Sequence, residues 1–184
     1  MSANTANRAY TYPQSTDTFR PHLDFKELAE DVDADVEALE ARTQQPPLCV
    51  VRNSGTQSVA NNGAVLTWNT EDRDTANIHN TGVNPSRLTP NVQGDWQFTA
   101  TIQWASNTTG RRGVGIRLNG STVYYGNINP AGTGVQGVTV NVTLPMNGSS
   151  DYVECWGFQE SGAGLLTHTD LNSTRFEARL VWRA

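Results

Sequence analysis

The sequence predicts a mainly β protein in which an antiparallel β-sandwich of about ten strands, most simply a jelly roll, follows an N-terminal arm and one short helix. Three observations lead to this prediction. After residue 48, apolar and polar residues alternate in several stretches, and Asn-Gly pairs typical of tight turns lie between them. Before residue 43, a single stretch has apolar residues at helical spacing. The 16 glycines and the 36% hydrophobic content suit short strands joined by many turns.

Residues 1–23 are polar and lack the apolar content for a core of their own. A disordered tail has this composition. So does a peptide that becomes ordered in a groove or along a sheet edge of another protein. In the second case the anchors are Tyr10, Tyr12, Phe19 and Arg20.

Residues 24–42 are predicted to form a helix, and residues 43–47 a linker. In the helix, apolar residues are spaced alternately four and three positions apart and form one stripe: Phe25, Ala29, Val32, Val36 and Leu39. Asp24 and Glu27 resemble a capping box, and the two prolines at the end of the linker stop the helix. A helix of this length, about 28 Å, would leave the stripe wet unless it finds a partner. The partner is either the chain's own β domain or further copies of the helix in a short parallel coiled coil.

The charge of the chain is concentrated in this helix. Eight carboxylates face only Lys26 and Arg42 there, a net charge of -6, whereas the whole chain carries -5. Bundled helices would bring like charges together, so burial of the stripe must outweigh the repulsion, or a basic partner must surround the helices. A solvated acidic face is the simpler explanation of any single charge.

The β domain is predicted to cover residues 48–184. The expected strands are Leu48–Arg52, Ala64–Trp68, Ser86–Thr89, Trp96–Trp104, Val114–Leu118, Thr122–Asn127, Val138–Leu144, Asp151–Gln159 and Phe176–Trp182. The Asn-Gly pairs at 62–63, 119–120 and 147–148 predict tight turns. In the last strand, Phe176, Ala178, Leu180 and Trp182 alternate with polar residues or Val181 and are expected on one face.

The strand Asp151–Gln159 has apolar residues on both faces. Val153 and Cys155 share one face, and Tyr152, Trp156 and Phe158 share the other. Such a strand needs cover on both sides. Either a loop of the same chain covers the aromatic face, or this face is a subunit interface, where aromatic residues are enriched.

Several function classes find no support in the sequence. No segment is apolar and long enough to span a membrane, no signal peptide is visible, and the negative charge disfavours nucleic-acid binding. The sequence contains no nucleophile elbow, zinc-protease, Cys-x-x-Cys or phosphate-loop motif, so we expect no enzyme and no cofactor. Cys49 and Cys155 form either a disulfide or, as cytosolic synthesis favours, two buried thiols.

Two loops carry candidate binding residues. Glu71, Asp72, Asp74 and His79 are close enough in sequence to approach a cation, but their spacing matches no EF-hand. A polar loop that makes local turn bonds is the simpler explanation, so we expect no metal site. Arg111 and Arg112 form a basic turn that could contact an anionic glycan or a neighbouring stalk, although a solvated hairpin is the commoner explanation of such a turn.

The order of the segments resembles known phage proteins. The arm and helix, TYPQSTDTFRPHLDFKELAEDVDADVEALEAR, resemble the N-terminal segment of tail-fibre and minor-tail proteins of phages that infect actinobacteria. The stretch from LTWNTEDRDTANIHNTG to GVGIRLNG, with the closing RFEARLVW, resembles phage-borne globular heads of the complement C1q and tumour-necrosis-factor type. The resemblance implies a ten-stranded jelly roll that assembles as a homotrimer above a trimeric stalk, with Tyr152, Trp156 and Phe158 at the interface.

We therefore expect a virion structural protein that forms a short trimeric fibre or spike. Its arm would bind another virion protein on the capsid, collar or tail, and its head would be exposed for attachment to a host-surface glycan. It would be made in the host cytoplasm and would bind neither nucleic acid nor membrane. The alternatives are a capsid or collar decoration protein with a purely structural role, and a glycan-degrading enzyme, for which nothing in the sequence pairs two carboxylates.

Overall fold

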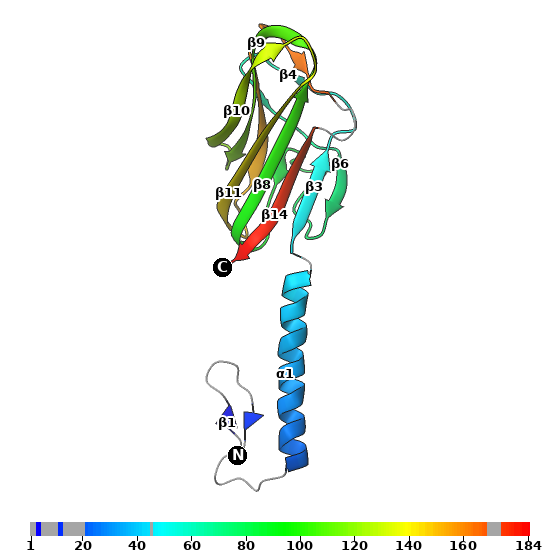
Figure 1. Ribbon diagram of the computed structural model, residues 1–184, viewed down its shortest axis with the longest axis vertical. Coiled ribbons are helices and arrows are strands. Elements are labelled where there is room, and N and C mark those ends of the chain that lie inside the picture. The colour runs from blue at the N-terminus through cyan, green and yellow to red at the C-terminus, as the bar shows by residue number, and fades with distance from the viewer. Residues whose placement is uncertain (1–2, 5–10, 13–20, 45, 169–173) are drawn as a thin grey trace. The chain divides into compact units, whose positions relative to one another are not determined.

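A computed structural model describes residues 3–4, 11–12, 21–44, 46–168 and 174–184 of the chain (Figure 1). The chain divides into two compact units, Met1–Pro46 and Pro47–Ala184. In the first unit, β1 (Ala3–Asn4) pairs antiparallel with β2 (Thr11–Tyr12). Of the predicted anchors, Tyr10, Phe19 and Arg20 lie outside the described residues, and only the backbone of Tyr12 is described.

The predicted helix is present as α1 (Pro21–Gln44). It begins at Pro21 instead of Asp24, because the fixed φ and missing N–H of proline suit the first turn of a helix. It ends before Pro46 and Pro47, since a proline disfavours helical backbone at the residue that precedes it. No helix among the described residues has the length and apolar character needed to cross a membrane.

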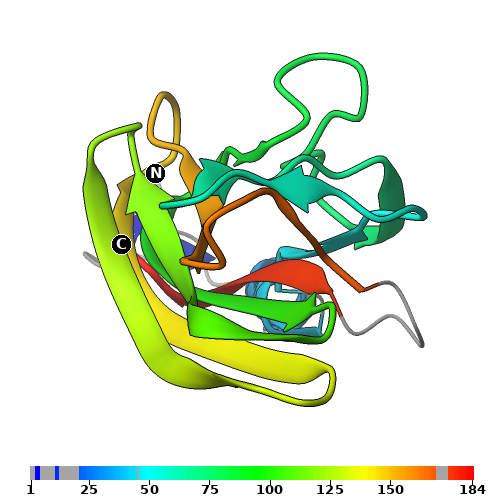
Figure 2. The same cartoon turned by 90° about the horizontal axis from the view of Figure 1, so that it is seen from above.

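The second unit, which we call the head, is an antiparallel β-sandwich of two five-stranded sheets (Figures 1 and 2). One sheet has the strand order β11 (Gln136–Asn147), β8 (Gln93–Trp104), β14 (Arg175–Arg183), β3 (Leu48–Arg52) and β6 (Thr70–Asp74). The other has the order β10 (Thr122–Gly132), β9 (Asn107–Leu118), β12 (Val153–Gln159) and β5 (Ala64–Val65), with β7 (Arg87–Leu88) also paired to β12. A small third pair joins β13 (Leu165–Leu166) to β4 (Ser58–Val59).

The head core confirms the predicted alternation. From β8 the inward residues are Trp96, Phe98, Ala100, Ile102 and Trp104, all fully buried. Facing them from the other sheet are Val114, Ile116, Val153 and Cys155. The two cysteines, Cys49 on β3 and Cys155 on β12, are both buried and free, so the predicted thiols are present and the disulfide is not. Burial raises the pKa of both thiols.

Some strands differ from the expected boundaries. Of the predicted strand Ala64–Trp68, only β5 is strand, although the Leu66 amide still donates to the Cys155 carbonyl on β12. The Trp68 amide instead donates to the Pro85 carbonyl. The acidic stretch expected as a loop is largely strand β6, an edge strand with mostly exposed residues and therefore no apolar alternation to reveal it. The short strands β4 and β13 were not predicted, since two residues carry no readable period.

The predicted hairpin turn at Asn119-Gly120 is confirmed and links β9 to β10. Both residues have positive φ, 49° and 72°, which is the backbone of the tight turn that suits the twist of paired strands. The Asn119 side chain also contacts the neighbouring strand connection, because its Nδ2 donates to Asp151 Oδ1 at 2.9 Å and its Oδ1 accepts from the Tyr152 amide.

Candidate functional site

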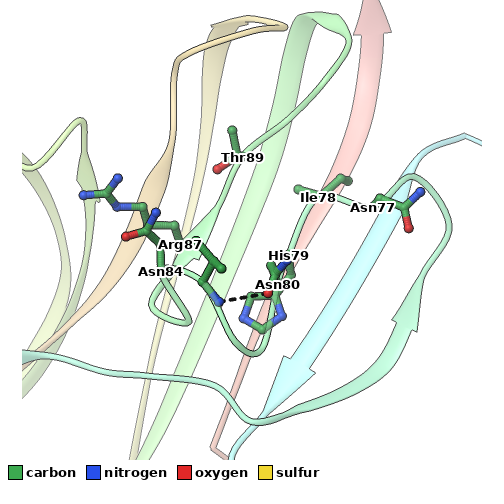
Figure 3. Close-up of a pocket in the computed structure, with 8 residues that line it drawn as sticks. Asn77, Ile78, His79, Asn80, Asn84, Arg87 and Thr89 are labelled. Atoms are coloured by element: carbon green, nitrogen blue, oxygen red, sulfur yellow. Dashed lines mark hydrogen bonds between the residues drawn. The ribbon is translucent and has the colours of Figure 1, made fainter.

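A polar recess of about 300 Å³ lies in the loop between β6 and β8. Its lining is Asn77, Ile78, His79, Asn80, Val83, Asn84, Arg87 and Thr89 (Figure 3). The two arms of the loop are tied at its base, where the Thr89 amide donates to the Ile78 carbonyl at 2.8 Å. Below, we refer to this feature as the loop recess.

Asp74, the last residue of β6, fixes the start of this loop. Its Oδ1 accepts the backbone amides of Ala76 and Ile78 at 3.2 and 3.1 Å, and its Oδ2 accepts the amide of His79 at 2.9 Å. A carboxylate that accepts three amides holds a turn in one conformation. The floor of the loop recess is therefore set by backbone bonds to one side chain.

His79 clamps the loop from inside. Its side chain has no exposed surface, and its Nδ1 lies 2.8 Å from Glu71 Oε1 on β6. Its Nε2 lies 3.1 Å from the Pro85 carbonyl oxygen on the other arm of the loop. The two partners are a carboxylate oxygen on the sheet edge and a backbone carbonyl oxygen on the far arm. The ring thus connects the sheet edge to the far arm of the loop.

These contacts account for the residues proposed above as a cation site. Glu71 binds His79, Asp72 binds Arg52 at 2.7 Å, and Asp74 is saturated by amides. Across the described residues, no group of three or more His, Cys, Asp or Glu side chains is arranged to hold a metal ion. The alternative explanation, a polar loop that makes local turn bonds, is therefore the one the structure supports.

Three side chains of the loop recess keep their polar groups available. Within the described part of the chain, the carboxamides of Asn77 and Asn84 and the hydroxyl of Thr89 make no hydrogen bond. Asn77 and Asn84 both have φ of 53°, a backbone conformation that asparagine tolerates better than most residues. Asn80 is different, since its Oδ1 accepts the amides of Gly82 and Val83 at 2.9 Å each.

Arg87 forms the wall of the loop recess next to β12. Its guanidinium carbon lies 3.9 Å from the centroid of the Tyr152 ring, and its Nε lies 3.5 Å from Glu154 Oε1. The same Glu154 oxygen accepts the Ser86 hydroxyl at 2.9 Å. The positive charge of Arg87 is thus already engaged by an aromatic face and a carboxylate.

The aromatic face of β12 is covered in part by arginines of the same chain. Arg87 lies over Tyr152, and Arg117 and Arg111 lie 5.6 and 5.8 Å from the ring centroids of Trp156 and Phe158. All three aromatic residues are half-buried. Turns of the same chain also lie against this face, because a Cβ on Gly63 would be 2.8 Å from the Trp156 ring and one on Gly120 would be 2.9 Å from the Tyr152 hydroxyl. Intrachain cover therefore comes from arginine side chains and from turns, and the subunit interface on this face stays a prediction.

The basic turn differs from its predicted role. Arg112 is fully buried, and its guanidinium donates to the carbonyls of Thr109, Arg111 and Asn107, so it cannot contact a ligand at the surface. Burial lowers the pKa of Arg112. Arg111 is exposed but forms a two-point ion pair with Glu160 at 2.6 and 2.7 Å. This hydrogen-bonded pairing lowers the pKa of the Glu160 carboxyl.

The prediction for Trp182 was wrong. A register irregularity between Leu180 and Trp182 interrupts the pairing of β14 with β8. Such a bulge adds a residue to one strand and changes the faces of those that follow. Val181 and Trp182 are consequently 53% and 68% exposed, whereas Leu180 remains buried. Sequence alternation alone gives no sign of this change.

Several of the carboxylates available for glycoside hydrolysis are held in structural bonds. Besides Glu154 and Glu160, the Asp151 carboxylate accepts from the Asn119 side chain and from the Asn147 amide, both at 2.9 Å. Such acids are held by neutralising or hydrogen-bonding partners and are not poised as a free acid and base pair.

Comparisons with known proteins identify the architecture. No family model matches the sequence, and no curated protein does. Among solved structures, the globular domain of zebrafish complement 1qA aligns with a TM-score of 0.56 at 13% identity, over 75% of this chain and 99% of that one. Murine APRIL at pH 5.0 aligns with a TM-score of 0.56 at 7% identity, over 74% of this chain and all of that one.

The head has a C1q/TNF-like jelly-roll fold. Sequence identities this low establish the fold alone. The predicted fold class of the head is confirmed in this respect. In the C1q/TNF-like head, the loop recess therefore belongs to the connection between β6 and β8 of the sandwich.

Proposed function

We propose that this chain is a virion structural protein that forms a short homotrimeric fibre or spike of a phage. The N-terminal arm binds another virion protein, α1 is the stalk, and the C1q/TNF-like head is exposed for attachment to a host-surface glycan. The phage assignment is supported by the resemblance of the arm, helix and head segments to phage fibre proteins. The fold of the head agrees with that resemblance.

The observation that carries the proposal is the apolar stripe of α1. Leu28, Val32 and Val36 are 37%, 39% and 47% exposed. At the two ends of the stripe, Phe25 and Leu39 are 65% and 59% exposed. Heptad spacing with exposed apolar side chains is the pattern of helices that pack against copies of themselves.

The energetic balance favours association of the helices. Full burial of one valine, leucine or phenylalanine contributes about 1.5–3 kcal/mol relative to full exposure. Like charges spaced four residues apart cost only about 0.2–0.5 kcal/mol a pair. Five seam residues in each copy therefore outweigh the repulsion between the acidic faces, and added salt should strengthen the assembly further.

A trimeric stalk gives the head its functional advantage. Three linked heads bind a repetitive surface polymer with an avidity above the affinity of one head, without any new contact. This arrangement makes weak individual sites sufficient for attachment.

The test is a head deletion in the intact particle. Phage that carry residues 1–46 alone should keep the protein on the particle but adsorb poorly to host cells, and the purified full chain should sediment as a trimer. Unchanged adsorption with reduced particle stability would instead indicate a decoration protein. Release of reducing sugar from host glycan by the purified chain would indicate an enzyme.

A further inference from the structure

We propose that the loop recess is a binding site for one residue of an uncharged saccharide. This inference rests on the proposed attachment function, because it names the site and the ligand class of the head. The expected site of contact had been the basic turn, but Arg112 is buried there and Arg111 is paired with Glu160. The loop recess is a concave polar surface of the head.

The loop recess is rigid before any ligand arrives. Asp74 fixes three amides at its base, and His79 ties Glu71 to the Pro85 carbonyl through a side chain with no exposed surface. A preformed site loses less conformational entropy on binding than a mobile loop does. A shallow site makes few contacts with a small ligand, so it binds measurably only if little entropy is lost.

The available groups match sugar hydroxyls. A hydroxyl both donates and accepts a hydrogen bond, and a carboxamide offers both functions on one planar group. Asn77, Asn84 and Thr89 provide two such carboxamides and one hydroxyl. Figure 3 shows Asn84 close to Arg87 on one arm of the loop and Asn77 on the other, with Ile78 and His79 between them. Val83, 66% exposed, adds an apolar surface for the face of a sugar ring.

The charges of the lining select an uncharged ligand. No aspartate or glutamate lines the loop recess, so it offers no attraction for a cation. Its one arginine, Arg87, lies over Tyr152 and beside Glu154, which leaves little net positive charge for an anionic sugar. With a volume of about 300 Å³, the loop recess is at the lower end of small-ligand pockets and suits a single sugar unit.

The experiment uses the isotope-labelled full chain and three probes at concentrations up to about 100 mM: glucose, galactose and mannose. At least one should shift backbone amide resonances of residues 77–89 and the side-chain amides of Asn77 and Asn84. Absence of saturable shifts with all three, or shifts confined to other parts of the head, would overturn the proposal. Tighter binding of glucuronic acid than of the neutral sugars would overturn the ligand class.

Variants isolate the side chains from the backbone. Asn77→Gly and Asn84→Gly remove the carboxamides but tolerate the positive φ, so each should weaken sugar binding at least fivefold while the rest of the spectrum is unchanged. Asn62→Gly is the matched control, because Asn62 is exposed and has a φ of 72° in a different turn. Equal affinity of all three variants would show that the loop recess is not the site.

The two proposals fail in different ways. If head deletion abolishes adsorption but no sugar binds in the loop recess, attachment stands and this site is wrong. If a sugar binds there but head deletion leaves adsorption unchanged, the site stands and the attachment function is wrong.

Discussion

At the scale of single residues, the head uses its polar side chains mainly to fix backbone. The Asp74 carboxylate accepts three backbone amides of one loop, and the Arg112 guanidinium donates to three backbone carbonyls of one turn. In the sequence, both residues were candidates for ligand binding. The reason is that buried amides and carbonyls must find partners, and a nearby charged group is a strong one. Residue type therefore indicated that these side chains make polar contacts. It did not indicate whether the partner is the chain's own backbone or a ligand.

Replacement of Asp74 by alanine should destabilise the head by about 2 kcal/mol, because three loop amides lose a charged acceptor. Urea denaturation of the variant measures this loss. The matched control is Asp72→Ala, which removes a partly exposed ion pair with Arg52 and should cost about 0–1 kcal/mol. Equal losses for the two variants would show that Asp74 does not organise the loop.

The two cysteines should resist alkylation in the folded protein. Burial raises the pKa of both thiols, so neither forms the reactive thiolate at pH 8. Mass spectrometry after iodoacetamide treatment should find no modification in buffer and two modified cysteines in urea. Stability should also fall above about pH 8.5, because the unfolded chain then releases thiol protons that the folded chain keeps. Modification in buffer at the rate seen in urea would contradict this.

At the scale of elements, α1 and β14 show two outcomes for apolar spacing. The apolar stripe predicted from the heptad spacing lies on α1 and is exposed in the single chain. In β14, the spacing of two holds through Leu180 and then fails at the bulge, so Trp182 reaches the surface. The helix period depends on the backbone of one element, whereas the end of β14 depends on its register with β8.

Charges placed in the stripe should abolish self-association. The double variant Val32→Asp, Val36→Asp puts two carboxylates into the proposed seam, and sedimentation should then report a folded single copy at micromolar protein. Ala34→Asp is the control, because Ala34 is exposed and lies outside the stripe, and it should leave the assembly intact. If the double variant sediments like the unmodified chain, α1 is not the association element.

At the scale of the whole molecule, two surfaces of the head are candidates for the proposed contact between copies. One is the aromatic face of β12, which arginines of the same chain already cover in part. The other is the pair Val181 and Trp182, whose exposed apolar surface has a clear gain from burial. This pair also lies beside the entry of the chain into the head, because the Leu180 amide donates to the Pro47 carbonyl.

Cross-linking should distinguish the two surfaces. If Val181 and Trp182 form the proposed contact between copies, Trp182→Cys in the full chain should give covalent dimers under mild oxidation. Ile128→Cys probes the β12 face, because the Ile128 and Phe158 side chains lie on either side of Gly113. A Cβ built on Gly113 would be 3.1 Å from Ile128 and 3.5 Å from Phe158. Val135→Cys is a control that is 47% exposed on the β10–β11 connection. Efficient cross-linking at 128 instead of 182 would support the β12 interface.

The sequence by itself determined the main division of the molecule, the helix, the alternating strands β8, β9, β11 and β12, the Asn-Gly turn at 119–120 and the jelly-roll class. These features depend on local periodicity and on backbone preference, which neighbouring residues specify. Only the tertiary structure decided that Arg112 is internal, that Asp74 and His79 build a loop, that Trp182 is exposed and that arginines cover the aromatic face. Those outcomes depend on which distant segments meet, since register, burial and the choice of a hydrogen-bond partner arise from the packing of the two sheets.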